Sequence, residues 1–367
     1  MRIAHISDTH LGRRQYNLEQ REQDFYDAFN EAIDKIIEER VDILIHSGDL
    51  FDSPNPPVKA LYTLKNALNR LEGKTKVVTV LGEHDIPKRR AMNPHRLFNM
   101  QVLGRFELET VTIDDILIGG ISNLKGRYVA HLKQELTKFD PIANNHQKSI
   151  LVCHQALRRY LPFEGAYELT LDDLPRNANY YALGHIHSRA TPIQFGKGLL
   201  AYSGSTEITG KDEINSWVTN GKGFYLVDIN EEVEQEFIKL DVRPQVDLEL
   251  DVENLNSLED HLTFDKKPLM HIALFGEIPD KNRTFLKLQE ILKERVIYFK
   301  HAFRTSRIRE VEVPRGPIEY QTIFTNYFED EELGRFAYSL YELLANNDIE
   351  GATELAQNTL EEREIVE

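Results

Sequence analysis

Short apolar runs alternate with longer amphipathic stretches through the first half of the chain. The apolar runs predict strands, and the stretches with apolar residues at helical spacing predict helices. Strands are expected at residues 2–6, 41–46, 76–81, 149–153 and 180–183, and helices at about 19–40, 58–71 and 128–139. Strands and helices that alternate in this order imply parallel strands joined by right-handed crossovers. The fold class expected from this pattern is α/β.

Further strands are expected before the first domain ends near residue 240. Two apolar runs, at 108–113 and 115–120, also read as strands. Between residues 190 and 230, short apolar runs alternate with glycines, which is typical of antiparallel strands. We therefore expect mixed sheets with helices outside them, in a first domain that spans residues 1–240.

The pattern restarts after residue 240. Strands are expected near 246–251, 268–275 and 295–301, and helices near 254–262 and 280–293. Residues 241–313 are thus predicted to form a small separate α+β domain. The prolines and glycine at the start of residues 314–328 indicate a linker.

The last part of the chain, residues 329–367, reads as two amphipathic helices joined by a short loop. The apolar residues expected on their exposed faces are Phe336, Leu340, Leu343, Leu344 and Leu355. Two short helices cannot bury such faces on their own. They either pack on the body of the chain or dock on a partner protein, and the preceding linker favours the partner.

Composition adds several exclusions. The chain has 367 residues, of which 41% are hydrophobic and 28% charged, as in soluble proteins of two or three domains. No apolar run approaches the roughly 18 residues of a membrane span, and residues 1–30 lack a signal-peptide pattern. We therefore expect no membrane contact and a cytoplasmic location. The single cysteine, Cys153, excludes an intrachain disulfide and is expected to be a small buried apolar side chain.

Charge is distributed unevenly along the chain. The net charge of −16 argues against nucleic-acid binding driven by total charge. However, basic residues cluster at Lys88–Arg90 and again at Lys300, Arg304, Arg307 and Arg309. Residues 315–367 contain 13 acidic and 3 basic residues. Any contact with nucleic acid is therefore expected at the basic clusters and not at the tail.

Side chains that ligate metals follow each of five predicted strands. They are Asp8, His10, Asp49, Glu83, His154, His185 and His187. An Asp-x-His pattern alone is more typical of a solvated turn, but five strand ends with the same chemistry are better explained by one shared site. In open α/β sheets, ligands bind beyond the carboxyl ends of the strands. If the first strand stays extended, Asp8 and His10 point the same way.

Seven donors exceed the four that one tetrahedral ion takes, and they suit two ions bridged by a carboxylate. Such a pair of ions activates water and holds the attacking and leaving oxygens of phosphoryl transfer. Oxygen and nitrogen donors together accept Mn, Fe, Co or Zn. His84 is expected to face the substrate and to protonate the leaving oxygen or stabilise the phosphate, with Asp85 orienting its imidazole. His5 and His46 lie within strands and are expected to be buried and hydrogen-bonded.

These motifs resemble the five signatures of the calcineurin-like metallophosphoesterases, in the same order and over about residues 1–230. The matching residues are Asp8-Thr9-His10, Gly48-Asp49, Gly82-Glu83-His84-Asp85, His154 and Gly184-His185-Ile186-His187. Within this superfamily, Ser7-Asp8-Thr9-His10-Leu11-Gly12 and Gly48-Asp49-Leu50-Phe51-Asp52 are similar to the Mre-eleven/SbcD nucleases of double-strand-break repair. The small second domain and the helical tail extend the likeness over the whole chain.

The resemblance implies a mixed β-sandwich flanked by helices, a small α+β capping domain that contacts DNA, and a C-terminal helical tail. It implies Mn-dependent 3′-to-5′ exonuclease and single-strand endonuclease activity, a homodimer, and a tail bound to a coiled-coil ATPase of the Rad-fifty/SbcC type. The expected location is cytoplasmic, prokaryotic and nucleoid-associated.

The resemblance also implies roles for single residues. It puts Asp8, His10 and His187 on one metal and His154 and His185 on the other, with Asp49 bridging and His84 contacting phosphate. Two positions depart from the family. Glu83 stands where the family normally has Asn, and Asp52 stands where some relatives have a second catalytic His, so its role is open.

Basic residues near the site and in the second domain are predicted to contact double- and single-stranded DNA. They are Arg13, Arg14, Lys88, Arg89, Arg90 and Arg304; the run Lys88–Arg90 is equally typical of a solvated surface. Two other functions fit the same residues. One is hydrolysis of a small phosphoester, and the other is a DNA-binding scaffold whose activity is weakened by Glu83.

Overall fold

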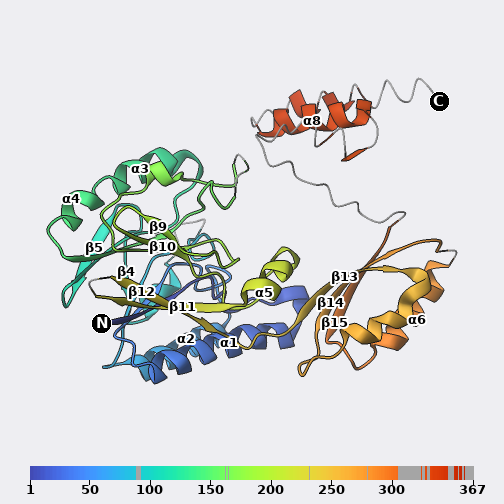
Figure 1. Ribbon diagram of the computed structural model, residues 1–367, viewed down its shortest axis with the longest axis horizontal. Coiled ribbons are helices and arrows are strands. Elements are labelled where there is room, and N and C mark those ends of the chain that lie inside the picture. Colours follow the sequence, from blue (N-terminus) through green and yellow to red (C-terminus); the bar gives the residue numbers. More distant parts are fainter. Residues whose placement is uncertain are drawn as a thin grey trace. The chain divides into compact units, whose positions relative to one another are not determined.

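The computed structural model describes residues 1–87, 92–161, 163, 165–230, 232–278, 280–304, 324, 327, 328, 331–345, 351–353, 355–357 and 359. The chain forms two compact units, Met1–Thr305 and Ser306–Glu367 (Figure 1). The domain boundaries expected at 313 and 328 adjoin residues outside the described part, and all three expected boundaries stay predictions.

Two six-stranded sheets face each other in the first unit. The first has the order β12-β11-β1-β2-β3-β4 and the second β5-β6-β7-β8-β10-β9. The strands of the first sheet are β1 (Arg2–Ile6), β2 (Ile43–His46), β3 (Lys76–Thr79), β4 (Gln101–Val102), β11 (Gly223–Ile229) and β12 (Val233–Lys239). Those of the second are β5 (Glu109–Ile113), β6 (Ile116–Ile121), β7 (Lys148–His154), β8 (Tyr180–Gly184), β9 (Ile193–Phe195) and β10 (Gly198–Tyr202).

The two sheets bury apolar side chains on both of their faces. Ile43 and Ile45 of β2 join the core between the sheets together with Ile150 of β7. Leu44, between the two isoleucines, belongs instead to the core under the helices, because successive strand residues point to opposite faces. Strands buried on both sides read as continuous apolar runs, which is why the sequence pattern located them.

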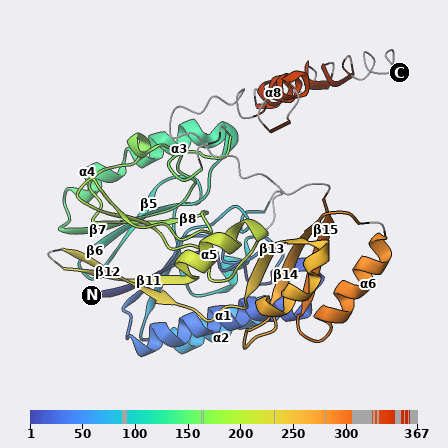
Figure 2. The same ribbon diagram turned by 45° about the vertical axis from the view of Figure 1, so that its right-hand side comes forward.

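Helices cover both outer faces of this sandwich (Figure 2). Helices α1 (Glu19–Glu38) and α2 (Val58–Leu71) pack on the first sheet, and α3 (Val129–Leu136) and α4 (Phe139–Ala143) on the second. The predicted sandwich of mixed sheets flanked by helices is therefore confirmed. Cys153 of β7 is buried in the core under α3 and α4, and burial raises the pKa of its thiol.

The helix expected at about 128–139 corresponds to α3, and a second short helix, α4, begins at Phe139. Another part of the predicted pattern was incomplete. The segment 190–230 contains the expected antiparallel pair β9–β10 and the antiparallel strand β11. It also contains a helix that was not expected, α5 (Ile214–Asn220), and β10 pairs in parallel with β8. A helix of 7 residues is too short to display an apolar period.

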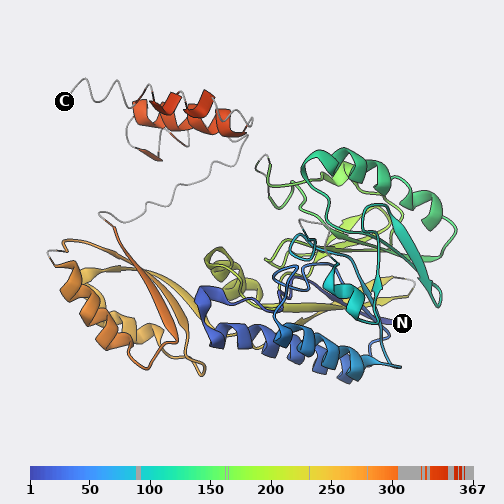
Figure 3. The ribbon, with the colours of Figure 1, turned by 180° about the vertical axis from the view of Figure 1, so that it is seen from behind.

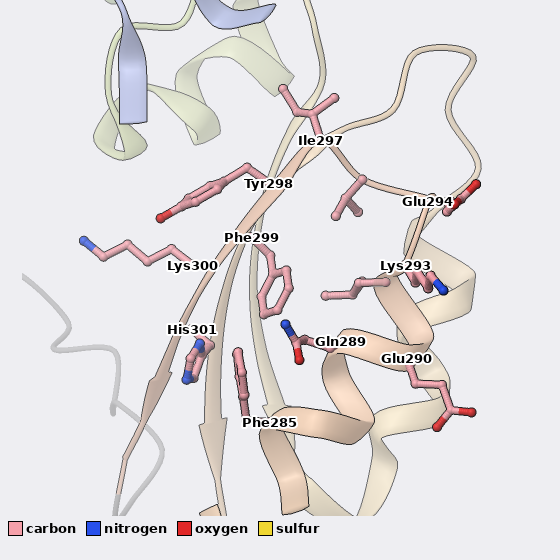
Figure 4. A pocket seen from close by; sticks show the side chains of 12 residues that line it. Phe285, Gln289, Glu290, Lys293, Glu294, Ile297, Tyr298, Phe299, Lys300 and His301 are labelled. Atoms are coloured by element: carbon pink, nitrogen blue, oxygen red, sulfur yellow. The ribbon is translucent and has the colours of Figure 1, made fainter. Parts of the chain in front are cut away.

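A three-stranded parallel sheet follows, in the order β13-β14-β15. It consists of β13 (Gln245–Asp251), β14 (Leu269–Phe275) and β15 (Tyr298–Phe303), and α6 (Lys281–Leu292) covers one of its faces (Figure 3). The helix expected at 254–262 is a 3-10 helix, Val252–His261. A hollow of about 910 Å³ lies between α6 and the edge strand β15, where Phe285, Phe299 and His301 line it (Figure 4). None of the residues predicted for the metal site lines it.

Buried polar contacts fasten this small sheet to the first sandwich. The guanidinium of Arg243, just before β13, binds both carboxylate oxygens of Asp24 on α1 at 2.6 and 2.8 Å. Tyr16 stacks on Tyr298 of β15 with ring centroids 5.0 Å apart. Its hydroxyl lies 3.4 Å from Nε2 of His271 on β14. The small sheet is therefore held by both ion pairing and ring stacking.

The second unit contains α8 (Glu331–Ala345) and further helical residues at 351–353 and 355–357. Phe336, Leu340, Leu343 and Leu355 are half-buried, and Leu344 is 53% exposed. The expected loop at Asn346–Asp348 and most of the linker lie outside the described residues. Among the helices that the structure describes, none is both long and apolar enough to cross a membrane.

Candidate metal centre

The loops after β1 and β2 run side by side and bring acidic and imidazole groups together. Asp8 donates its backbone amide to Gly48 O at 3.0 Å, and His10 donates its amide to Asp49 O at 3.1 Å. Asp8 and His10 have φ values of 51° and 43°. The strand therefore does not stay extended to His10, but the two side chains converge all the same, since their ligand atoms belong to one group. The strand ends at Ile6, and the loop converges with the next loop through backbone hydrogen bonds instead.

One group of four side chains has the geometry of a cation site. Asp8, His10, Asp49 and His187 each offer a ligand atom, and these atoms lie within 4.8 Å of one another. Nε2 of His187 lies 3.1 Å from Nε2 of His10 and 3.6 Å from Oδ1 of Asp8. Asp8, His10 and Asp49 are buried. Two imidazole nitrogens and two carboxylates at this spacing suit a divalent transition-metal ion.

His154 offers a further ligand atom beside this group. Its Nε2 is buried and has no hydrogen-bond partner among the described residues, and it lies 3.3 Å from Oδ2 of Asp49. Its Nδ1 donates to the carbonyl oxygen of Ser47 at 2.8 Å, so Nε2 is the ring atom that faces the carboxylates. Burial alone would lower the pKa of His154, but Asp49 and Asp8 raise it to about 10, so a cation that binds Nε2 displaces a proton. A buried nitrogen left without a partner is costly, and a second cation would satisfy it.

His185 lies next to His154 but outside the group of four. The two rings are 5.2 Å apart, and the backbone amide of His185 donates to both oxygens of Asp8 at 3.2 and 3.3 Å. Burial and the neighbouring His154 lower the pKa of His185 to about 4. A neutral imidazole is the form that binds metal, so His185 fits the predicted second ion.

His84 stands beside the metal ligands, and a backbone carbonyl fixes its ring. Its ring centroid is 5.0 Å from that of His10, and its Nδ1 lies 2.9 Å from Asp52 O. With the proton on Nδ1, its Nε2 is free to meet a substrate. The expectation that Asp85 orients this imidazole is wrong. The Asp85 carboxylate accepts the amides of Gly82, Leu50 and Phe51 at 3.0 to 3.2 Å, so it fixes the loop instead.

Asp52, whose role the sequence left open, contacts the candidate ligand His10 at the ring nitrogen Nδ1. Its Oδ1 lies 3.3 Å from Nδ1 of His10 and 2.9 Å from Nη1 of Arg13. Burial opposes ionisation of Asp52, but His10 and Arg13 lower its pKa. An ionised carboxylate at Nδ1 leaves Nε2 of His10 as the atom that faces the ligand group.

Glu83, the other departure from the family, pairs with a lysine. Its carboxylate forms an ion pair with Nζ of Lys125. Burial raises the pKa of Glu83, but Lys125 outweighs this and lowers it. Two groups of convergent ligand atoms are found among the described residues: the group of four, and a group of His10, Asp52 and His84. Glu83 belongs to neither of them. Its role as a ligand stays a prediction.

Comparison with known proteins shows matches over the segment that contains these residues. A family model described as calcineurin-like phosphoesterase matches residues 1–189. The DNA double-strand break repair protein Mre11 of Sulfolobus acidocaldarius is 35% identical over 82% of this chain and 81% of its own length. The chain belongs to the Mre11 family. A protein of the same description from Sulfurisphaera tokodaii is 39% identical over 79% of this chain and 77% of its own length. Another, from Thermoplasma acidophilum, is 34% identical over 95% of both chains.

Membership of the Mre11 family makes this chain a phosphodiesterase that binds divalent metal. The alignment with the Thermoplasma relative covers 95% of both chains, so the relationship extends beyond the sandwich to the small sheet and the tail. The ligand group of Asp8, His10, Asp49 and His187 lies within the segment that the phosphoesterase family model matches.

The basic residues predicted to contact DNA stay predictions in this Mre11-family chain. Arg14 lies 3.1 Å from Glu19, and Arg304 lies 2.7 Å from Glu249. Arg13 donates to Asp52 and to the carbonyl oxygen of Thr209, each at 2.9 Å. Lys88, Arg89 and Arg90 lie outside the described residues.

Sequence reasoning missed a buried group behind His187. Glu213 contacts Nδ1 of the candidate ligand His187, the ring nitrogen that lies away from the other ligand atoms. Lys222 donates to the backbone carbonyl oxygen of His187. Neither stands in a recognisable motif, and neither follows an apolar strand, so no local signal indicated them.

Proposed function

We propose that this Mre11-family phosphodiesterase is the Mn-dependent nuclease of a DNA double-strand break repair complex, with 3′-to-5′ exonuclease and single-strand endonuclease activity. The observation that carries the proposal is the group of four convergent ligands with His84 beside it. The relatives' description as DNA repair proteins supports DNA as the substrate. A nuclease of this kind acts where the chromosome is, so we place it at the nucleoid of a prokaryotic cytoplasm.

Two divalent ions fit the side chains of the centre. Asp8, His10 and His187 would hold one ion, His154 and His185 the other, and Asp49 would lie between them. When bound, such ions supply hydroxide near neutral pH and neutralise charge on the phosphate. Mn is proposed because the donors combine oxygen and imidazole nitrogen. Glu83 remains a candidate ligand of the second ion.

The protein's own groups then divide the remaining work. His84, with its Nδ1–H held by the carbonyl of Asp52, presents Nε2 toward the substrate; when the ring is doubly protonated, Nε2–H can protonate the leaving oxygen or stabilise the phosphate charge. Asp52 and Asp85 hold the loops that carry His10 and His84. Arg13, Arg14, Arg304 and the run Lys88–Arg90 are proposed to contact the DNA backbone.

The decisive experiment is cleavage of labelled double- and single-stranded DNA with Mn²⁺, Mg²⁺ or EDTA. We expect Mn-dependent cleavage by the wild type and about 10²–10⁴-fold slower cleavage by His84→Gln, because a general acid contributes a factor of this size. His261→Gln, an exposed histidine of the small domain, is the matched control and should retain full activity. Wild-type protein that binds two Mn²⁺ ions and cleaves no DNA would contradict the proposal.

The position of Glu83 favours one alternative, a DNA-binding scaffold with weakened activity. Its carboxylate adds negative charge beside the phosphate site, partly offset by Lys125. DNA binding without cleavage, together with cleavage restored by Glu83→Asn, would support that alternative. Rapid hydrolysis of a small phosphoester without DNA binding would indicate the other function considered from the sequence.

A homodimer is proposed through an apolar surface of the first sandwich. Val58 and Tyr62 of α2 and Leu97 are 81%, 63% and 59% exposed, and they line one groove of about 1080 Å³. Exposed apolar patches of this kind mark interaction sites, and a second copy of the chain would cover the same patch on each partner. Tyr62→Asp should convert a dimer to a monomer in light scattering without changing Mn²⁺ binding.

The tail is proposed to bind the coiled-coil base of a Rad-fifty/SbcC-type ATPase. The exposed Leu344 and the half-buried Phe336, Leu340, Leu343 and Leu355 supply an apolar face that a groove can bury. Deleting residues 318–367 should abolish ATPase binding in a pull-down and leave Mn²⁺ binding intact. Unchanged capture of the ATPase would reject this assignment.

A further inference from the structure

A buried carboxylate lies behind the ligand His187. Oε1 of Glu213 is 2.9 Å from Nδ1 of His187, and the carboxylate side chain is 4% exposed. Glu213 ends the 3-10 helix Lys211–Glu213 and directly precedes α5. The preceding loop and this helix end therefore bring an acidic group to the side of the imidazole that faces away from the ligand cluster.

A buried lysine completes this arrangement. Nζ of Lys222, whose side chain is 2% exposed, forms an ion pair with Oε2 of Glu213. It also donates to the carbonyl oxygen of His187 at 2.9 Å and to Oγ of Ser205 at 2.6 Å. Lysine is almost never buried to this extent unless it is paired. The same ion pair therefore contacts both the ring and the backbone of His187.

The remaining positions around Glu213 are filled by short polar groups. Oε2 accepts Ser205 Oγ and the amide of Thr209, each at 3.2 Å. The hydroxyl of Thr209 donates to Oε1 and lies 2.8 Å from Nδ1 of His187. Both oxygens of the carboxylate thus accept hydrogen bonds, and the group cannot rotate without losing several of them.

His154 has a different support. Its Nδ1 lies 2.8 Å from the carbonyl oxygen of Ser47, which is neutral. Nδ1 of His187 instead lies beside the buried, charged carboxylate of Glu213. Hydrogen bonds to charged acceptors are stronger, and burial strengthens them further. A change at Glu213 should therefore act on the ion that His187 holds and not on the ion that His154 holds.

We propose that Glu213 is a positioning residue for the metal ligand His187, and that Lys222 holds Glu213 in place. The carboxylate keeps the proton on Nδ1, so that Nε2 presents its lone pair to the cation, and it increases the donor strength of the ring. Lys222 balances the charge of Glu213, so that this carboxylate adds no net charge beside Asp8 and Asp49. The inference rests on the proposed role of His187 as a metal ligand.

The test is calorimetric titration of Mn²⁺ into the full chain after removal of bound metal with EDTA. Glu213→Gln should raise the dissociation constant of one Mn²⁺ ion by about 10–100-fold, the usual effect of removing such a partner, and leave the other within about threefold. Half-maximal DNA cleavage should require correspondingly more Mn²⁺. The rate at saturating Mn²⁺ should stay within about threefold of wild type.

Thr209→Val is the matched control, because it removes the hydroxyl that also lies beside Nδ1 and keeps Glu213. Because Lys222 and the Thr209 amide still hold Glu213, Thr209→Val should weaken the ion at His187 by less than Glu213→Gln does and leave the other ion within about threefold. If Thr209→Val weakens one ion and Glu213→Gln does not, the hydroxyl is the positioning group and the inference is wrong. If Glu213→Gln fails to fold, Glu213→Asp, which retracts the carboxylate by one methylene group, should show the same weakening of one ion.

Two outcomes separate this inference from the proposed function. Wild-type protein that binds no Mn²⁺ would contradict the metal-dependent function itself. Two normal Mn²⁺ sites in the wild type, weakened equally or not at all in Glu213→Gln, would contradict only the role of Glu213.

Discussion

Four of the candidate ligands share a backbone conformation that most residues avoid. Asp8, His10, Asp49 and His185 have φ values of 51°, 43°, 54° and 85°. Such conformations cost free energy in residues other than glycine and persist where the surroundings hold them. Here the backbone hydrogen bonds between the loops of Asp8 and Asp49 do so. The fold itself therefore holds these candidate ligands in an uncommon backbone conformation.

A buried histidine outside the centre gives a pH-dependent prediction. His5 is fully buried between the Tyr180 hydroxyl at 2.9 Å and Ser47 Oγ at 3.0 Å. Burial, only partly offset by Asp8, lowers its pKa to about 3. The unfolded chain binds a proton near pH 6.5, so its contribution to stability is complete above that pH and is lost as the pH falls toward 3.

We expect the free energy of unfolding in EDTA to fall below pH 6.5, with His5 contributing up to about 1.4 kcal/mol per pH unit. His5→Asn should be less stable than wild type at pH 7.5, and the difference between the two should shrink as the pH is lowered. Urea unfolding at several pH values measures this. Parallel pH profiles for the two proteins would show that His5 is not responsible.

The convergence of the group of Asp8, His10, Asp49 and His187 was predictable, but the contacts that support it were not. These residues follow apolar runs, and the edge of an α/β sheet gathers such positions. His5 and His46 are buried and hydrogen-bonded, as their place within strands indicated. Glu213 reaches His187 through a loop and a helix end, and the inward turn of Asp85 depends on amides of another loop. Contacts of this kind leave no pattern in the local sequence.

At the scale of elements, long and strongly patterned segments were predicted and short ones were not. Helices α1 and α2 display an apolar stripe over many turns, and β1, β2 and β7 are continuous apolar runs. By contrast, α5 is too short for an apolar period of its own, and it is held by Ile214 and Trp217, which pack in the core cluster that contains Phe224. The parallel pairing of β10 with β8 depends on tertiary packing, which the spacing of apolar residues does not specify.

The junction between α1 and the small sheet yields a prediction at this scale. Asp24 accepts from Arg243 and, at 2.8 Å, from the fully buried Arg21. Asp24→Ala would leave both guanidinium groups without this partner, so we expect a loss of about 3–5 kcal/mol in the free energy of unfolding. Arg243→Met should cost less, because Asp24 keeps Arg21.

Urea unfolding of the full chain provides the measurement. The control is Glu39→Ala, which removes an ion pair with Arg2 whose side chains are 35% and 41% exposed. That loss should stay within about 1 kcal/mol. Equal effects of Asp24→Ala and Glu39→Ala would show that the buried network does not fasten the small sheet.

At the scale of the whole molecule, the strongest excess of acidic residues and the candidate metal ligands lie in different parts of the chain. Residues 315–367 hold 13 acidic and only 3 basic residues, whereas the candidate ligands all precede residue 190. An acidic tail is repelled by a phosphate backbone. This distribution suits a division in which the first unit meets the nucleic acid and the tail meets a protein.

The phosphoesterase match ends at residue 189, but the sandwich does not. Strands β9, β10, β11 and β12 all come later and complete both sheets. We therefore expect a fragment of residues 1–189 to show no cooperative unfolding transition in urea, followed by circular dichroism. A fragment of residues 1–305, the first compact unit, should unfold cooperatively. Cooperative unfolding of the shorter fragment would contradict this prediction.

The place of β1 inside the first sheet has a consequence for biosynthesis. Arg2 of β1 pairs with Asp228 of β11, so β1 leaves the ribosome and waits for a partner strand that is made more than two hundred residues later. At about 5–20 residues per second, this wait is on the order of 10–45 s. Throughout that time one edge of an apolar strand remains open to other nascent chains. Protection by a chaperone during translation should therefore matter more for the yield of this protein than the stability of its finished fold.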